Sequence, residues 1–269
     1  MIINGRDIAS DILASLRGKF THTPIVRAIT CDPSPATVSY LKIKEARAEE
    51  AGMKLEVIRL EDTASESDVI DAILRPGADA VIVQLPLPAR MNSEKIVNSI
   101  PISKDADVLS QQAYEAFEHS LPSGILPPVV IAIQEILIRS GVQVAGKNVV
   151  VIGQGKLVGK PASVWLTQQG AKVSVVTREQ GMPLLLTPAD IIISGAGSPG
   201  LITPESIRNG VVLIDAGTSE QGGQMVGDAD PRCAEVAGVF TPVPGGVGPI
   251  AVACLFRNVA TLLERSLQE

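Results

Sequence analysis

The sequence contains two series of short apolar runs that are separated by stretches with helical spacing. Apolar runs of about four to eight residues, bounded by turn residues, favour strands that are buried on both faces, as in a parallel sheet. The first series predicts strands and helices in alternation at Ile25–Thr30, Ala36–Ala51, Leu55–Leu60, Ser67–Leu74 and Ala80–Gln84. This order is typical of right-handed βαβ units, so the predicted fold class is α/β.

A second series follows a break in the pattern. Leu121–Pro128 is rich in Pro, Ser and Gly, and helical spacing returns at Val129–Arg139. The later elements are expected at Asn148–Ile152, Gly159–Gln169, Lys172–Val176, Ile191–Ser194 and Val211–Ile214, with a last amphipathic helix that ends near Leu267. We therefore predict two open α/β domains, at residues 1–125 and 126–249, which agrees with a soft prior of roughly 100–200 residues per domain.

The composition argues against several classes of protein. No apolar run approaches the roughly 20 residues that cross a bilayer, and the start of the chain has neither a basic region nor an apolar stretch like those of a signal peptide. The net charge is −6 with no basic stripe, which disfavours nucleic acid and membrane partners. Cys31, Cys233 and Cys254 lack the close spacing of a metal site and are expected to be buried. We expect a cytoplasmic protein without a metal.

The segment from Val149 to Pro161 combines an apolar strand, a glycine turn and a helix start. Gly153, Gly155 and Gly159 would let the backbone approach a dinucleotide pyrophosphate, and the helix N-terminus would offer unpaired N–H groups. The spacing is G-x-G-x-x-x-G rather than the usual G-x-G-x-x-G, so a plain strand–turn–helix junction stays an alternative. The strand before the turn and the helix after it favour the cofactor interpretation.

The choice of cofactor should depend on the end of the next strand, where NAD enzymes commonly place an acid and NADP enzymes a cation. Thr177, Arg178 and Glu179 follow that strand. Arg178 could pair with a 2′-phosphate, whereas Glu179 could bind a free ribose hydroxyl. NADP is favoured and NAD stays possible, and both charges could instead be solvated loop residues.

Candidates for proton transfer are few, because the sequence has only two histidines and neither lies in a segment that resembles a site. Tyr40 and Lys44 are four residues apart on a predicted helix and would share one face. Gln84 ends an apolar strand before Leu85-Pro86-Leu87-Pro88, at the strand edge where open α/β sheets bind ligands. Asp107, in the loop Lys104-Asp-Ala-Asp107, could supply a carboxylate to that edge. Each feature also fits a surface helix, a turn or a solvated loop.

These four motifs and a fifth near the C-terminus, in order along nearly the whole chain, resemble the bifunctional methylenetetrahydrofolate dehydrogenase/cyclohydrolase family. The resemblance covers the Tyr–Lys helix, the strand-end motif at Gln84–Pro88, the Lys-Asp-x-Asp loop, the cofactor turn, and the loop Pro242-Val-Pro-Gly-Gly-Val-Gly-Pro249, which is highly specific. It implies oxidation of methylenetetrahydrofolate with NADP, then hydrolysis of the methenyl product to 10-formyltetrahydrofolate. It also implies an N-terminal catalytic domain, a C-terminal Rossmann-type NAD(P)-binding domain with a cleft between them, a final helix (250–269) that returns to the N-terminal domain, and a homodimer.

The resemblance also assigns roles to residues. Lys44 is implied as the catalytic lysine, Gln84 as its positioning partner, Tyr40 as the residue that stacks on the folate rings, and Asp107 as the pterin contact. The cofactor would be held by Gly153, Gln154, Gly155, Lys156, Val158, Gly159, Thr177 and Arg178. The substrate would also meet Pro244, Gly245 and Gly246.

The chain departs from the family pattern at several positions. Val108 stands where the family usually has Gly, Pro127-Pro-Val-Val130 replaces a Pro-Cys-Thr-Pro segment, and Gln154 replaces an Arg that some members offer to the 2′-phosphate. Arg178 could compensate for the last change. The departures keep open a dehydrogenase without cyclohydrolase activity, or another Rossmann dehydrogenase. A nucleotide-sensing scaffold without catalysis is the alternative from another class.

Overall fold

The computed structural model describes residues 1–177 and 186–267, which form two compact α/β units. The three-stranded unit comprises Ser10–Pro128 and the chain from Val252 onward. The five-stranded unit comprises Met1–Ala9 and Val129–Ala251. Packing thus groups the first nine residues with the five-stranded unit. The division by function stays a prediction, with a catalytic domain at 1–125 and 250–269 and a cofactor domain at 126–249.

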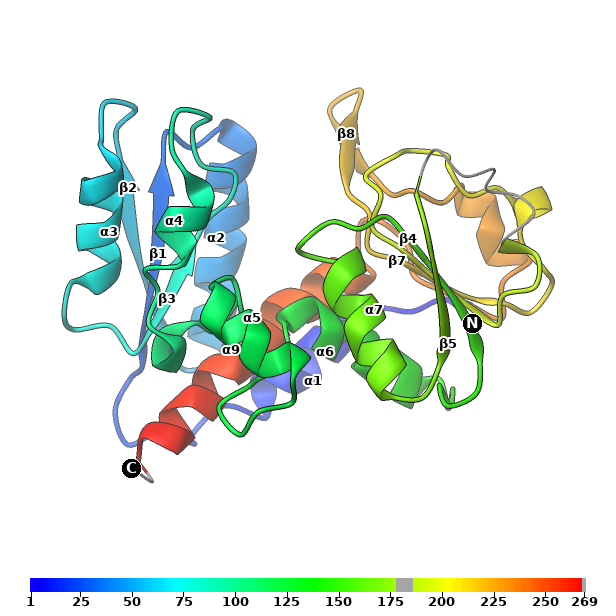
Figure 1. The fold of residues 1–269 in the computed structure, drawn as a ribbon, viewed down its shortest axis with the longest axis horizontal. Coiled ribbons are helices and arrows are strands. Elements are labelled where there is room, and N and C mark those ends of the chain that lie inside the picture. Colours follow the sequence, from blue (N-terminus) through cyan, green and yellow to red (C-terminus); the bar gives the residue numbers. More distant parts are fainter. Residues whose placement is uncertain (178–185, 268–269) are drawn as a thin grey trace. The chain divides into compact units, whose positions relative to one another are not determined.

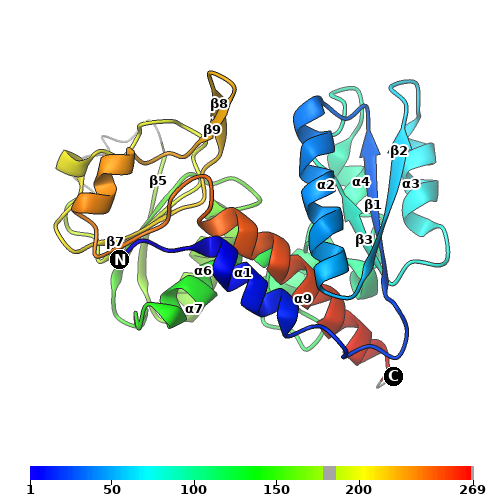
Figure 2. The ribbon, with the colours of Figure 1, turned by 180° about the vertical axis from the view of Figure 1, so that it is seen from behind.

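The three-stranded unit has a parallel sheet of order β2-β1-β3. Its elements are β1 (Ile25–Cys31), α2 (Pro35–Glu50), β2 (Lys54–Leu60), α3 (Glu66–Leu74), β3 (Ala80–Val83), α4 (Ser93–Val97), the 3-10 helix η1 (Ile102–Lys104) and α5 (Gln111–Glu118). Figures 1 and 2 show α2 and α3 on opposite sides of the sheet. All five elements predicted here are present, and α4 and α5 are additional.

The five-stranded unit has a parallel sheet of order β10-β7-β6-β4-β5 and a separate antiparallel hairpin, β8–β9. Its elements are β4 (Asn148–Ile152), α7 (Gly159–Gln168), β5 (Lys172–Val176), β6 (Ile191–Ser194), the 3-10 helix η2 (Pro204–Ser206), β7 (Val212–Asp215), β8 (Ser219–Gln221), β9 (Gln224–Val226), the 3-10 helix η3 (Pro231–Glu235) and β10 (Val239–Phe240). The predicted parallel α/β organisation is confirmed in both units.

Three further helices complete the described chain: α1 (Gly5–Ala14), α6 (Pro128–Arg139) and α9 (Val247–Ser266). The final helix α9 packs against the N-terminal helix α1, as Figure 2 shows. Among the helices in the described ranges, α9 alone is long and apolar enough by composition to cross a membrane. However, 61% of its apolar window is buried inside the protein, which is typical of a core helix.

Each unit has its own apolar core, in which strand residues pack against helix residues. In the three-stranded unit, Ile29 and Val81 pack with Val69 and Ile73 of α3 and with Ile96 of α4. In the five-stranded unit, residues of β4, β6 and β7 form the core with the 3-10 helix η3. Cys31, Cys233 and Cys254 are buried free thiols, as predicted.

Candidate active site

Both sheets have a topological switch point, where successive strands in the chain lie on opposite sides of the first strand. It falls between β1 and β3 in the three-stranded unit and between β4 and β6 in the five-stranded unit. Open α/β sheets bind ligands at the carboxyl ends of the strands at such a point, because the connecting helices diverge there. The predicted site residues are therefore of most interest where they follow these four strands.

The helix that carries Tyr40 and Lys44 begins directly after β1. Ser34 is its N-cap and accepts a hydrogen bond from the backbone N–H of Thr37 at 3.2 Å, and Pro35 occupies the first turn. These two residues fix where α2 starts, and hence which helical face Tyr40 and Lys44 share. The helix delivers both side chains to the carboxyl end of the sheet.

Lys44, Gln84 and Tyr40 lie together in the structure. The Lys44 Nζ donates a hydrogen bond to Gln84 Oε1 at 3.0 Å and lies 5.5 Å from the centroid of the Tyr40 ring. Gln84 follows β3 directly, and its own Nε2 donates to the Leu85 carbonyl oxygen at 3.0 Å. That second bond turns the amide oxygen of Gln84 toward the lysine. Only 6% of Lys44 is exposed, so its amine is held in a defined place.

The loop that follows η1 brings Asp107 to the same group. Asp105 forms an isolated parallel bridge with Val81 of β3, and its buried carboxylate accepts the backbone N–H groups of Leu109 at 3.1 Å and Ser110 at 2.8 Å. Asp105 thus holds the loop and the start of α5. Asp107, two residues further, is near enough for its charge to act on Lys44.

Burial is the largest cause of the pKa shifts of Lys44, Asp107 and Tyr40, and in each case it favours the uncharged form. Burial lowers the pKa of Lys44, and the negative charge of Asp107 partly opposes that shift. Burial raises the pKa of Asp107, against the effect of the lysine, and burial together with Asp107 raises the pKa of Tyr40. A lysine with a lowered pKa can be a neutral amine closer to neutral pH, and a neutral amine can accept a proton.

The structure shows two features around this loop that the sequence did not reveal, namely the backbone conformation of Val108 and the hydrogen bonds of Asn258. Val108 adopts φ +56°, a left-handed conformation that a β-branched residue rarely adopts, at the position where the family usually has Gly. Asn258 of α9 is 3% exposed, and its Nδ2 donates to the carbonyl oxygens of Ala106 and Leu126, each at 2.9 Å. An amide on the apolar face of this amphipathic helix, one turn from the buried Leu255 and Leu262, was the signal that could have revealed Asn258.

The glycine turn at the end of β4 has the close backbone packing that a dinucleotide site needs. Gly153 has φ +93°, and a Cβ added there would lie 2.9 Å from the Gly195 carbonyl oxygen. A Cβ on Gly159 would lie 2.0 Å from the Gly153 carbonyl oxygen, whereas one on Gly155 would meet open space. The N-cap of α7, Val158, provides no side-chain hydrogen bond. The turn is therefore compatible with a pyrophosphate at the helix N-terminus.

The other predicted cofactor residues lie around this turn or beyond it. Gln154 and Lys156 are exposed within the turn, and Thr177 directly follows β5 and is partly buried. The backbone N–H of Gly153 donates to the Val176 carbonyl oxygen at 2.9 Å, which places the end of β5 beside the turn. Arg178 lies outside the described residues.

The glycine–proline loop before α9 forms a structured turn with the first residues of the chain. The Gly5 N–H donates to the Gly245 carbonyl oxygen at 2.8 Å, and the Gly246 N–H donates to that of Pro242 at 2.7 Å. A surface pocket of about 280 Å³ adjoins this turn, and Pro244 and Gly245 are part of its lining. Gly246 is not part of that lining. The pocket belongs wholly to the five-stranded unit.

The comparisons with known proteins agree over nearly the whole chain. Residues 3–107 match the model of the tetrahydrofolate dehydrogenase/cyclohydrolase catalytic domain, and residues 127–267 match that of the NAD(P)-binding domain of the same family. The bifunctional protein FolD of Staphylococcus carnosus is 34% identical over 280 residues, which cover 99% of this chain and 97% of the relative.

Solved structures of the family are similar to this protein over nearly its full length. The bifunctional FolD enzyme of Campylobacter jejuni has a TM-score of 0.94 and 28% identity, with 99% of each chain covered. The Trypanosoma brucei methylenetetrahydrofolate dehydrogenase-cyclohydrolase, solved with NADP and an inhibitor, has a TM-score of 0.92 and 29% identity over 100% of this chain and 99% of that one. With both domain models matched and a relative above 30% identity, this chain belongs to the tetrahydrofolate dehydrogenase/cyclohydrolase family.

Proposed function

We propose that this protein oxidises 5,10-methylenetetrahydrofolate to 5,10-methenyltetrahydrofolate with NADP and then hydrolyses the product to 10-formyltetrahydrofolate. The observation that carries the proposal is the buried Lys44 amine, which is bonded to Gln84 and lies beside Tyr40. Family membership identifies the substrates that this group would meet. The two solved structures named above are methylenetetrahydrofolate dehydrogenase/cyclohydrolases by name, and one was solved with NADP.

The first reaction transfers a hydride and needs no proton transfer. The methylene carbon that bridges two folate nitrogens loses a hydride, and the resulting cation is delocalised over both nitrogens. NADP, when bound, supplies the hydride acceptor, and the backbone of Gly153–Gly155 and the start of α7 would hold its pyrophosphate. The protein must mainly keep the two reacting carbons about 3–3.5 Å apart, which explains why no catalytic histidine is required.

The second reaction adds water and needs a base. Water attacks the bridging carbon of the methenyl cation, one C–N bond breaks, and the released nitrogen gains a proton. We assign the removal of the first water proton to the neutral Lys44 amine, which then returns that proton to the nitrogen. The second water proton, on the hydroxyl of the adduct, leaves to solvent as the formyl C=O bond forms, so the hydrolysis releases one proton overall. Gln84 orients the amine through its bond to Nζ, and Tyr40 offers a flat face for the folate rings. Asp107 would bind the pterin and set the charge beside the lysine.

Several parts of this proposal rest on the sequence. Arg178, by its position after β5, is proposed to contact the 2′-phosphate of NADP in place of the missing cation at Gln154. Pro244, Gly245 and Gly246 are proposed to contact the substrate, and a homodimer is proposed, both on the family resemblance. A cytoplasmic location is proposed from the composition. Light scattering of the purified protein would measure its mass in solution.

The test is an absorbance assay that follows reduced cofactor and the methenyl intermediate separately. Purified protein is mixed with methylenetetrahydrofolate and either NADP or NAD. Reduction of NADP with little build-up of methenyl folate would support both activities. Lasting accumulation of methenyl folate would instead indicate a dehydrogenase without cyclohydrolase activity, reduction of NAD alone would contradict the cofactor assignment, and no reduction would contradict the enzyme proposal.

A further inference from the structure

The buried carboxylate of Asp228 lies outside the catalytic group and binds one loop. Asp228 is 0% exposed and follows the β8–β9 hairpin. Its Oδ2 accepts hydrogen bonds from Ser194 Oγ at 2.6 Å and from the Ala196 N–H at 2.8 Å, and its Oδ1 accepts the N–H of Ser198. One carboxylate therefore contacts three of five consecutive residues. Such charge-assisted bonds are stronger than neutral ones, so they define the path of this loop.

The loop, residues 195–198, lies against the cofactor turn. It follows β6 directly, at the switch point of the sheet, and the Gly195 N–H donates to the Ile152 carbonyl oxygen at 2.9 Å. A Cβ on Gly195 would lie 2.5 Å from Val158 Cγ1, and a Cβ on Gly153 would lie 2.9 Å from the Gly195 carbonyl oxygen. The loop and the glycine turn are so closely packed that there is no space for even one methyl group between them. A shift of the loop must therefore shift the turn.

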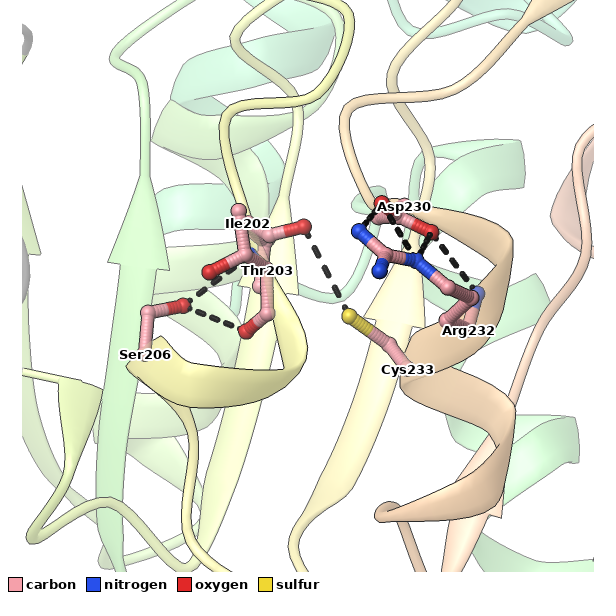
Figure 3. A network of polar contacts seen from close by, with 6 residues as sticks. All are labelled: Ile202, Thr203, Ser206, Asp230, Arg232 and Cys233. Atoms are coloured by element: carbon pink, nitrogen blue, oxygen red, sulfur yellow. Dashed lines mark hydrogen bonds and ion pairs between the residues drawn. The ribbon is translucent and has the colours of Figure 1, made fainter.

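The segment that carries Asp228 is itself held firmly. Ala229 forms a parallel bridge with Ile202, and the Ala229 N–H donates to Asp215 Oδ2 at 2.8 Å. Figure 3 shows the adjoining contacts, in which the Cys233 sulfur faces the Ile202 carbonyl oxygen and Asp230 pairs with Arg232. The backbone next to Asp228 is therefore held in place, which defines the position of its carboxylate.

A second carboxylate and a glycine limit the space around Asp228. The Gly217 N–H donates to Asp215 Oδ1 at 2.9 Å, so Asp215 lies on the same glycine. Burial, with a contribution from the Asp228 charge, raises the pKa of Asp215 to about 7. A Cβ on Gly217 would lie 2.2 Å from the Asp228 carboxylate. There is no room for that carboxylate to move toward Gly217.

We propose that Asp228 is a positioning residue for cofactor binding: its carboxylate fixes loop 195–198, and the loop in turn fixes the glycine turn that receives the dinucleotide. The proposal rests on the proposed NADP-dependent function and adds a residue to it. Asp228 acts through the loop and does not touch the reacting atoms. Its loss should therefore weaken cofactor binding and leave folate recognition by the three-stranded unit unchanged.

The test is the variant Asp228→Asn in the full chain, with Asp230→Asn as a matched control. An Asn amide can accept from fewer of the three donors, so at least one N–H or hydroxyl loses its partner. Asp230 lies two residues away, and its carboxylate bonds Arg232 and caps η3, a role that Asn also fills. The dissociation constant of NADP is measured by calorimetry without folate, and KM is measured for both substrates.

We expect Asp228→Asn to weaken NADP binding about tenfold and to raise the KM for NADP similarly, with the KM for methylenetetrahydrofolate within about twofold of wild type. The Asp230→Asn variant should match wild type. Ser194→Ala removes one donor and leaves the two backbone bonds, so it should give a smaller effect in the same direction. It also serves as the test if Asp228→Asn does not fold.

Two results would overturn the inference and can be told apart from failure of the proposed function. If wild type binds NADP and Asp228→Asn or, should that variant not fold, Ser194→Ala binds it equally well, Asp228 does not position the cofactor site. If the KM values for NADP and folate rise together, the carboxylate has only a general structural role. If wild type itself binds no NADP, the proposed function fails and this inference fails with it.

Discussion

The proposed hydrolysis depends on the side-chain amine of Lys44. A buried ammonium without full solvation is costly, so burial favours the neutral form of Lys44 and lowers its pKa. The nearby Asp107 charge acts in the opposite direction and limits how far the pKa falls. The balance of these two effects sets the pH above which the amine can act as a base.

Asp107→Asn should shift the pH dependence of hydrolysis to lower pH. The negative charge of Asp107 raises the pKa of Lys44, so its removal lowers that pKa further. The neutral amine then forms at a lower pH, and the acidic limb of the hydrolysis rate moves in that direction. The shift should appear only above the raised pKa of Asp107, because below it the carboxyl is already neutral.

The measurement is the rate of methenyl folate hydrolysis from pH 5 to pH 9, corrected for the uncatalysed rate. The folate concentration is kept saturating, because Asp107 is also proposed to bind the pterin. Gln111→Glu, at an exposed position on α5, is a control that changes the net charge by the same unit in the opposite direction at the surface. An unmoved or alkaline-shifted limb in Asp107→Asn would contradict the electrostatic role.

At most buried positions an alanine variant is more stable than a glycine variant, but at Val108 we expect the glycine variant to be the more stable one. At φ +56° a non-glycine residue is strained by roughly 1–2 kcal/mol, and glycine is not. The Val108 side chain is 5% exposed, so either substitution loses apolar burial, but only glycine also relieves the strain. Val108→Gly should therefore be more stable than Val108→Ala by about 1 kcal/mol in urea denaturation. Alanine as the more stable variant would contradict the strained conformation.

At the scale of elements, α9 links the end of the chain to the catalytic loop. Asn258 holds the carbonyl oxygen of Ala106, the residue before Asp107, and that of Leu126. Asn258 lies on the buried face of this amphipathic helix, where an apolar side chain would be expected, and its two hydrogen bonds explain why an amide is present. Through them α9 determines where Asp107 lies.

Asn258→Leu should weaken folate use and lower stability. The change leaves two carbonyl oxygens without the amide, which costs about 1–3 kcal/mol for each buried group. The KM for methylenetetrahydrofolate should rise several-fold, while the KM for NADP should stay unchanged. Arg265→Ala is the control, because Arg265 of the same helix bonds Ser123 and Gly124 and not the loop. An unchanged folate KM in Asn258→Leu would contradict the link.

Most elements were predictable because their signals are local. The strands from β1 to β7 have apolar runs bounded by turn residues, so β4, β5 and β6 have the predicted bounds and the others differ by one or two residues. The N-terminal helix α1, the short helices α4 and α5, the β8–β9 hairpin and the two-residue strand β10 were missed. The short helices depend on caps such as Asn92 and Ser110, and β10 depends on pairing with the distant strand β7, which periodicity does not reveal. The β8–β9 hairpin did have a local signal, because Gly222 and Gly223 form its two-residue turn.

At the scale of the whole molecule, the strand orders place the site, and they could not be derived from the sequence. Pairing of β1 with β3, and of β4 with β6, joins residues that are far apart in the chain. The grouping of Lys44 with Gln84 depends on the first of these pairings. The sequence could suggest that both residues lie at a strand edge, but only the register of the sheet brings Nζ and Oε1 to 3.0 Å.

Residues whose side chains bind the main chain of a loop could not be predicted from the sequence either. Asp228 and Asn258 bind main-chain groups of loops that are distant in sequence, and they have no motif of their own. Family motifs identified the residues proposed to meet substrate or cofactor. The residues that support those loops needed the structure.

The central claim is that one buried lysine serves the second reaction and is dispensable for the first. The most direct test is Lys44→Met in the two-signal assay, because methionine fills a similar volume and cannot accept the proton. A general base contributes roughly 10²- to 10⁴-fold, so hydrolysis should fall by that factor while NADP reduction falls less than about tenfold. Methenyl folate should then accumulate. An equal loss of both activities in a folded Lys44→Met protein would contradict the account.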